Sequence, residues 1–330
     1  MAKKSPVAVD LLVWMPIRGF LLALAWMPER LAYGSMAALG RLFFRLSSRR
    51  RGIVLSNLKQ AFGGEKSERE LLELGRRSTG EIFRVLVDVA RSPRMMRRDD
   101  IGERLDASGG REALELARRL APDKPVIICS PHLGSWEAAS LMAAQVFGDL
   151  HIIARPMANR FFQRYMLKTR SLFGQHILPR RGGIQQIRAG LKGGGHAVFL
   201  PDQNQRIRGK FVPFFGKLAS CDRSPILLSW MGGHPIVVGA ALRVGGGYRF
   251  RMIQSRVFLP PVPEEGQREE ALTQGILQLN QAMEELIREA PEQYFWLHNR
   301  FRTRPPEESP EEPREESRQG HGETDDPPAR

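Results

Sequence analysis

Cysteine is scarce in this sequence of 330 residues: only Cys129 and Cys221 occur, far apart along the chain. A framework of disulfide bonds is therefore not expected, and a reducing cytoplasmic setting fits the composition better. Neither cysteine belongs to a CxxC pair or to a cluster of His and Cys residues, so the sequence predicts no zinc site. Cys129 falls within an expected strand and is interpreted as a small core residue, not as a nucleophile.

Acidic residues are in deficit, with 36 Asp and Glu against 50 Lys and Arg and a formal net charge of +14. Residues 305–330 alone carry a net charge of −6, so the rest of the chain carries about +20. A strongly basic body favours anionic partners. No recognition helix, zinc finger or aromatic RNA-binding motif is evident, which argues against nucleic acid and leaves anionic lipids or an acidic carrier protein.

Long apolar runs are also lacking. The longest, residues 11–27, has 17 residues and is interrupted by Pro16 and Arg18, whereas a spanning helix needs about 20 apolar residues. We interpret it first as a membrane anchor that spans the bilayer or lies in its interface. Two alternatives are a cleaved signal peptide, since residues 23–25 resemble a cleavage site, and a buried core helix.

A cluster of arginines follows this segment and bears on its orientation. By the positive-inside tendency such a cluster keeps the following domain on the cytoplasmic side of a membrane. Lys3 and Lys4, at the other end of the segment, weaken that prediction. The cluster consists of Arg41, Arg45, Arg49, Arg50 and Arg51.

Short apolar runs alternate with amphipathic segments from residue 124 onward, which predicts an α/β fold with a mostly parallel central sheet flanked by helices. We expect a membrane-anchor helix at 1–30, one large α/β domain at 31–304 and, from its composition, a disordered acidic tail at 305–330. Strands are expected at 126–130, 151–154, 176–179, 196–201, 235–242 and 248–254. Helices are expected at 31–46, 53–62, 67–89, 135–146, 160–173, 183–191, 225–231 and 269–289.

The segment 130–137, Ser-Pro-His-Leu-Gly-Ser-Trp-Glu, carries the residues best suited to catalysis. It leaves an expected strand and enters an expected helix, where functional groups often gather in α/β sheets. Glu137 could reach back to one imidazole nitrogen of His132, which would fix the tautomer and raise the basicity of the other nitrogen. The alternative is a structural His132 and a helix-terminal Glu137 stabilised by the helix dipole.

Three arginines and one acid follow this segment at expected strand or helix ends. Arg155, Arg170 and Arg180 either bind phosphate or carboxylate groups or form a solvated positive face. Asp202 ends a buried strand, where an acid must be paired, and one of these arginines could be its partner. The alternative is that Asp202 only shapes a turn. The aromatic segment 211–216 is interpreted as a core cluster, and the alternatives are the lining of a substrate pocket or a border to the membrane.

Several segments, taken in order, make the sequence resemble the bacterial late acyltransferases of lipid A, the lauroyl and myristoyl transferases. The resemblance runs from the N-terminal segment to about Pro305 and leaves out the acidic tail. Each motif is weak alone, but their order and spacing together are specific. The motifs are Arg51 with Asn57-Leu58 and Ala61-Phe62, the His-four-residues-acid motif from His132 to Glu137, Arg155-Pro156 with Asn159, Arg170, Leu178-Pro179-Arg180, Pro201-Asp202-Gln203, and segments 211–216 and 294–305.

The resemblance implies an enzyme that moves a fatty acyl chain from an acyl-carrier-protein thioester to a hydroxyl of a lipid A precursor. His132 would be the general base, held by Glu137, and would return the proton to the departing thiolate. Neither an acyl-enzyme nor a metal or other cofactor is implied. Such an enzyme belongs at the inner membrane, with its catalytic domain on the cytoplasmic face.

Two other functions remain open at this point. One is an acyltransferase of the same fold that acts on a phosphatidylinositol mannoside or a lysophospholipid, since chemistry and fold would be shared. The other is a non-catalytic membrane-binding protein, which would keep the apolar N-terminal segment and the basic body without needing His132 and Glu137 as a pair.

Overall fold

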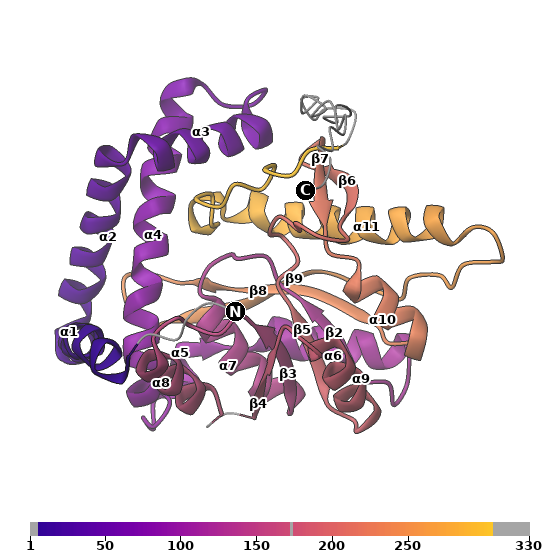
Figure 1. The fold of residues 1–330 in the computed structure, drawn as a ribbon, viewed down its shortest axis with the longest axis horizontal. Coiled ribbons are helices and arrows are strands. Elements are labelled where there is room, and N and C mark those ends of the chain that lie inside the picture. The colour runs from indigo at the N-terminus through magenta and orange to yellow at the C-terminus, as the bar shows by residue number, and fades with distance from the viewer. Residues whose placement is uncertain (1–5, 172–173, 306–330) are drawn as a thin grey trace, which may run out of the picture.

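The computed structural model describes residues 6–171 and 174–305, and the fold is that of these residues. They form an α/β fold in which helices flank a mostly parallel seven-stranded sheet (Figure 1). The predicted fold class is therefore confirmed. The predicted disordered tail at 305–330 lies, apart from Pro305, outside the described residues, as do the first five residues of the predicted anchor.

The centre of the sheet is parallel, with β8, β2, β5, β3 and β4 side by side in that order. At the other edge β9 runs antiparallel to β8, and the short β1 pairs with β9 in parallel. Apolar residues on both faces suit β2 and β5 to the middle of such a sheet. The strands are β1 (Leu105–Asp106), β2 (Ile127–Cys129), β3 (Leu150–Ala154), β4 (Gln175–Pro179), β5 (His196–Phe199), β8 (Ile236–Arg243) and β9 (Phe250–Phe258).

Each face of the sheet has its own apolar core. On one face α6 and α7 pack Ala113 and Ala143 against Ile128. On the other face α9, α10 and α11 pack against Ile127, because successive residues of a strand point to opposite sides. These helices are α6 (Ser108–Leu120), α7 (Trp136–Phe147), α9 (Gly183–Lys192), α10 (Ser224–Gly232) and α11 (Arg268–Glu289).

The N-terminal helices form a separate layer at one end of the sheet, with α2 alongside α4 (Figure 1). Among the described residues, α1 is the one helix long and apolar enough to cross a membrane. Only 17% of its apolar window is buried, so the interpretation as a core helix is wrong. The helices are α1 (Val7–Trp26), α2 (Glu29–Leu46), α3 (Ser48–Phe62), α4 (Glu68–Met95) and the short α5 (Ile101–Arg104).

The remaining elements lie around the carboxyl edge of the parallel strands. An antiparallel hairpin of β6 and β7 packs Phe214 and Phe215 into the core beside α11, which confirms the core interpretation for these two residues of segment 211–216 but not for Phe211. Neither this hairpin nor α6 was expected from the sequence. The elements are α8 (Arg160–Ser171), β6 (Lys210–Phe214), β7 (Lys217–Cys221) and the 3-10 helix η1 (Pro291–Gln293).

Candidate active site

Backbone hydrogen bonds hold the loop that joins β2 to α7. The N–H of Gly134 donates to the carbonyl of Gln293 at 3.0 Å, and the N–H of Phe295 donates to the carbonyl of His132 at 3.0 Å. The residues that follow α11 therefore clamp this loop from one side. These backbone hydrogen bonds by themselves position the backbone of His132.

Gly134 lets the same loop lie directly against β8. Its φ is +64°, and a Cβ would lie 2.0 Å from the carbonyl oxygen of Ala241, so a larger residue does not fit. The N–H of Ser135 donates to that carbonyl at 3.0 Å, and the Ser135 side chain caps α7 by accepting from the N–H of Ala138. The Gly-Ser pair thus determines where α7 begins and how His132 is presented.

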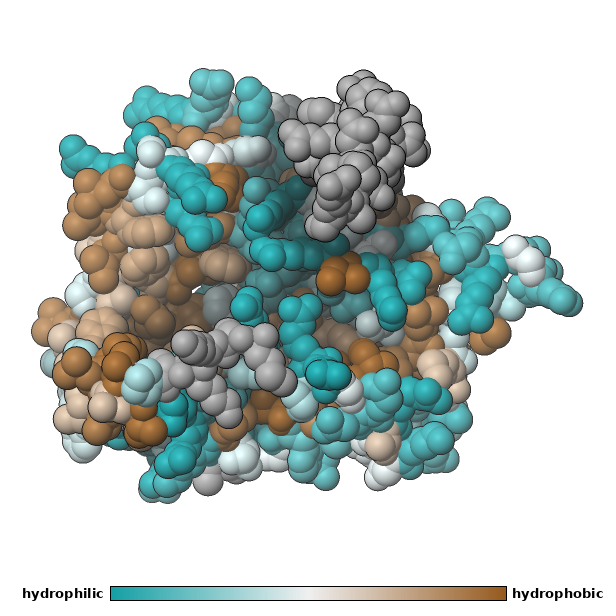
Figure 2. Space-filling model, in the orientation of Figure 1, coloured by the Kyte–Doolittle hydropathy of each residue, from teal (hydrophilic) through white to brown (hydrophobic). Residues whose placement is uncertain are grey.

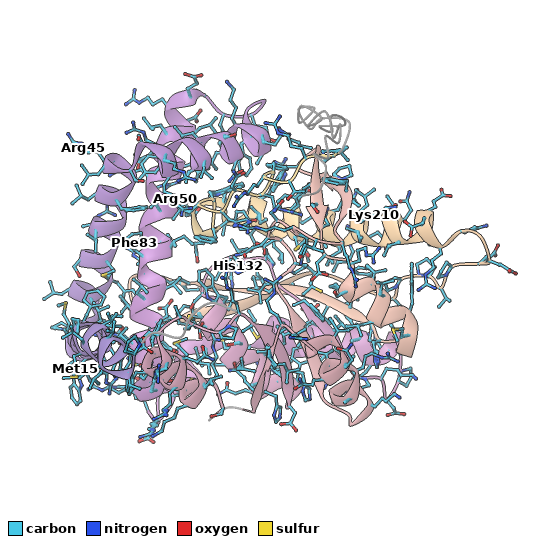
Figure 3. The ribbon with its side chains drawn as sticks, in the orientation of Figure 1. Met15, Arg45, Arg50, Phe83, His132 and Lys210 are labelled. Atoms are coloured by element: carbon cyan, nitrogen blue, oxygen red, sulfur yellow. The ribbon has the colours of Figure 1, made fainter. Side chains whose placement is uncertain are left out.

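His132 lies near the middle of the molecule, at the carboxyl edge of the parallel strands (Figure 3). Its Nδ1 is 2.7 Å from Oδ1 of Asp202, and its backbone N–H donates to Oδ2 at 2.7 Å. Asp202 follows β5, the neighbour of β2, so the sheet brings the two residues together. A carboxylate only accepts hydrogen bonds, so Nδ1 carries a proton and the lone pair of the neutral ring is on Nε2.

Asp202 is deeply buried but is surrounded by groups that favour its charge. The hydroxyl of Tyr294 hydrogen-bonds to it, and the Arg300 guanidinium lies close enough to attract it. Burial by itself would raise the pKa of the Asp202 carboxyl. The attraction and hydrogen bonds of His132 outweigh burial, so this pKa lies below its ordinary value and the carboxylate that orients His132 persists.

The second ring nitrogen of His132 faces a polar neighbour that the sequence did not suggest. The side-chain amide nitrogen of Gln203 lies 3.2 Å from Nε2 of the imidazole. The rings of Trp136 and Phe295 flank the imidazole, with centroids at 5.4 and 6.1 Å. In the neutral ring, the lone pair of Nε2 therefore faces the Gln203 amide and could accept a proton from a hydroxyl group in its place.

Glu137 does not contact His132 as the sequence suggested. Its carboxylate is bound by Arg170 of α8, with Nε 3.2 Å from Oε2 and Nη2 hydrogen-bonded to Oε1. The prediction that Glu137 fixes the His132 tautomer is therefore wrong, and so is the prediction that Asp202 pairs with Arg155, Arg170 or Arg180. The cause is the strand order, which places Asp202 against the imidazole and leaves Glu137 facing α8.

A cavity of about 1040 Å³ opens at these residues, and both His132 and Glu137 line it. Arg155, Arg170 and Arg180 line the same cavity, and their role as substrate-binding residues stays a prediction. Arg155 and Arg180 are exposed at its rim and form no ion pair with any described residue. They are therefore available to an anionic ligand.

The deeper part of the cavity is apolar. It runs between the sheet and helices α6 and α7, where Ala113, Ile128, Ala143 and Phe147 line it. All four side chains are buried from solvent. The volume of the whole cavity lies just above the range of about 300–1,000 Å³ that is common for ligand sites. A charged rim over an apolar interior suits a long-chain amphiphile.

A profile of the family described as bacterial lipid A biosynthesis acyltransferase matches residues 2–303, nearly the whole chain. The chain belongs to this family. The lipid A biosynthesis lauroyltransferase of Escherichia coli (strain K12) is 26% identical over 299 residues, which cover 89% of this chain and 92% of the relative. The lipid A biosynthesis palmitoleoyltransferase of the same strain is 27% identical over 201 residues, as is the lipid A biosynthesis acyltransferase of Shigella flexneri. Those two matches span 59% of this chain and only 61% of either relative.

In this member of the lipid A acyltransferase family, three further residues complete the site. The sequence analysis had assigned no site role to them. They are Gln203, Tyr294 and Arg300. Gln203 and Tyr294 contact the dyad of His132 and Asp202 directly. Arg300 is buried and donates to the backbone carbonyls of Gln203, after β5, and Ser220, within β7. All three lie in segments that carry the family resemblance, but nothing in those segments shows which side chain reaches His132.

A second histidine at the cavity, His298, is not equipped for acid–base work. Its Nε2 accepts a hydrogen bond from the backbone N–H of Asn204 at 3.0 Å. Burial lowers the pKa of His298 to about 4, so the ring is neutral near pH 7. Its role is to hold the chain after β5 in place. Within the described parts of the chain, no three His, Cys, Asp or Glu side chains are grouped to hold a metal ion.

Proposed function

We propose that this protein transfers a fatty acyl chain from an acyl-carrier-protein thioester to a hydroxyl of a lipid A precursor, at the cytoplasmic face of the inner membrane. The observation that carries the proposal is the His132–Asp202 dyad at the head of a cavity with an apolar interior. Family membership and the lauroyltransferase relative support lipid A as the acceptor.

In the proposed mechanism the acceptor hydroxyl takes the place of the Gln203 amide at Nε2 of His132. Nε2 accepts the hydroxyl proton while the oxygen attacks the thioester carbonyl carbon, and Asp202 stabilises the resulting imidazolium through Nδ1–H. The tetrahedral oxyanion then collapses, the carbon–sulfur bond breaks, and His132 returns its proton to the thiolate. The products are an ester and the free carrier thiol. The displaced Gln203 amide is a donor beside the oxyanion.

The Glu137–Arg170 pair has a supporting part in this scheme. It joins the first turn of α7 to the end of α8, on the wall of the cavity that His132 also lines. The bidentate contact fixes the Arg170 guanidinium on the wall of this cavity. In this proposal Arg155 and Arg180, which also line the cavity, bind phosphate groups of the acceptor.

The acceptor is tested most simply in cells. Deletion of the gene should leave lipid A one acyl chain short, and the wild-type gene should restore that chain, both measured by mass spectrometry of extracted lipids. Loss of an acyl group from a phosphatidylinositol mannoside or a phospholipid, with lipid A unchanged, would favour the alternative acceptors. Unchanged lipids in every class would favour a non-catalytic membrane-binding protein.

The donor proposal rests on charge. Acyl carrier protein is small and acidic, and the rim includes Arg206 and Arg208, exposed on the loop that follows Gln203. The double substitution Arg206→Glu/Arg208→Glu should raise the donor KM on the order of tenfold and change kcat little. Added salt should raise the wild-type donor KM, because the Debye length falls to about 8 Å at physiological ionic strength.

The matched control for this prediction reverses two exposed arginines that do not line the cavity, Arg69 and Arg97. It carries the same change in net charge and should leave the donor KM near the wild-type value. The acceptor is held in neutral detergent micelles throughout. A donor KM that is insensitive both to salt and to the rim substitutions would contradict electrostatic docking of the carrier.

A further inference from the structure

Helix α1 is docked on the protein along one side, and the first half of that side contacts α8 and the residue before it. Asp10 is 6% exposed, and its carboxylate accepts from Nε of Arg160 on α8 at 2.6 Å. The backbone carbonyl of Asp10 accepts from the Asn159 amide at 2.6 Å. One turn further on, the ring of Trp14 packs at 5.7 Å from that of Tyr165, also on α8. The start of α1 is thus bound to the catalytic domain.

The second half of α1 packs on the other N-terminal helices. Leu21, Leu24 and Ala25 are buried against residues of α2 and α4. The Arg94 guanidinium of α4 lies 4.2 Å from the ring centroid of Trp26, which is 69% exposed. Both ends of α1 therefore pack on the rest of the protein, and the opposite side of the helix carries exposed apolar residues such as Leu12 and Met15.

This docking does not suit a helix that crosses a bilayer. At 1.5 Å per residue, α1 spans about 30 Å, which fits the hydrocarbon thickness if the helix stands upright. An upright α1 would draw α8 into the membrane with it, and α8 exposes Arg164 and Lys168. Charged side chains at that depth are strongly unfavourable. A helix lying in the interface needs lipid on only one side.

Helix α2 adds a second apolar surface with no cover. One face packs on α4 through residues such as Tyr33 and Phe44. A helix face that is exposed to water is usually polar, but the opposite face of α2 carries an exposed stripe of leucines at helical spacing. Figure 2 shows hydrophobic residues gathered along the edge of the molecule that α1 and α2 form. The stripe consists of Leu31, Leu39, Leu42 and Leu46.

We propose that α1 and α2 together form an in-plane membrane-binding face, on which α1 lies along the bilayer interface without crossing it. A lipid surface fits better than a protein partner because the apolar face is bordered by arginines and by Trp26, the pattern of interfacial segments. Exposed Arg45 and Arg49, where α2 meets α3, suit anionic headgroups. This inference rests on the membrane location in the proposed function and specifies how the protein binds the membrane. Its tests measure membrane binding and not acyl transfer, so the two proposals can fail separately.

The first test places single cysteines at Pro6 and Arg30, exposed positions on either side of α1. Cys129 and Cys221 are free but buried, so background labelling is low. In inside-out membrane vesicles, both introduced cysteines should react with a membrane-impermeant maleimide, and neither should react in intact spheroplasts. Labelling of the two positions from opposite sides would overturn the in-plane arrangement.

The second test compares Leu42→Glu with Leu120→Glu, because the two leucines are both 49% exposed but only Leu42 lies on the proposed face. Binding of the purified proteins to vesicles of phosphatidylethanolamine and phosphatidylglycerol is measured by co-sedimentation. Leu42→Glu should weaken binding about tenfold or more, and Leu120→Glu should bind like wild type. Equal binding of the two variants, whether strong or weak, would overturn the role of α2.

Discussion

Replacement of His132 by alanine should lower the rate of acyl transfer by about 10²- to 10⁴-fold, the usual contribution of a general base. The reason is that Nε2 of this ring is the proposed base, and its contact with Asp202 sets the tautomer of the ring. The measurement is the initial rate with purified protein, an acyl-carrier-protein thioester and a lipid A precursor. Membrane association and the cooperative unfolding transition should stay close to wild type.

The control for this substitution is His176→Ala. His176 is exposed, stacks on His151 and does not line the cavity, so its loss removes an imidazole without touching the proposed chemistry. Its transfer rate should remain near wild type. A His132→Ala protein that transfers acyl chains almost as fast as this control would show that His132 is not the base.

The isosteric substitution Asp202→Asn should also be severe, with an expected loss of about 10²- to 10⁴-fold in kcat, because it removes the acceptor that keeps the proton on Nδ1. An asparagine amide can donate to Nδ1 instead, which would place the ring proton on Nε2. In the proposed mechanism Nε2 must be unprotonated to act as the base. ¹⁵N NMR of histidine-labelled protein reads the tautomer directly. The His132 signals should show protonated Nδ1 in wild type and lose that form in the variant.

Glu137→Gln is the matched comparison, since it too replaces a buried carboxylate by an amide. It breaks the ion pair with Arg170 but leaves both contacts of His132 in place. Its activity should fall, because Arg170 loses its anchor, while the His132 tautomer stays as in wild type. If Glu137→Gln changed the tautomer and Asp202→Asn did not, the assignment of Asp202 as the orienting residue would fail.

The position of His132 could be predicted from sequence because the signal is local. A buried run, a loop with Gly134 and a helix cap at Ser135 follow one another within a few residues, and together they place the histidine at the edge of a sheet. The structure confirms the local elements. The same reasoning placed Glu137 correctly in the first turn of α7.

The partners of these residues could not be predicted, because they depend on contacts far apart in sequence. Asp202 meets His132 only because β5 inserts beside β2, and strand order is not encoded in the pattern of either strand. Arg170 meets Glu137 because α8 packs across the start of α7. Spacing along the chain suggested a contact between His132 and Glu137, but the tertiary fold gives each a different partner.

The boundary of the membrane anchor shows the same limit. Composition identified residues 11–27 as apolar, and α1 includes most of them. Composition did not reveal the exposed leucine stripe of α2, because the average hydropathy of this helix is modest. The stripe indicates a membrane-binding face only when the opposite face of α2 is known to pack on α4. The division into an anchor at 1–30 and a domain at 31–304 remains a prediction.

The proposed reaction can be tested with purified protein, a series of acyl-carrier-protein thioesters and a tetra-acylated lipid A precursor, and the lipid products are analysed by mass spectrometry. We predict that the precursor gains one ester-linked acyl chain, with release of one equivalent of carrier thiol, in the wild type and not in His132→Ala. Thiol release without acylated lipid A, or equal product from His132→Ala, would contradict it.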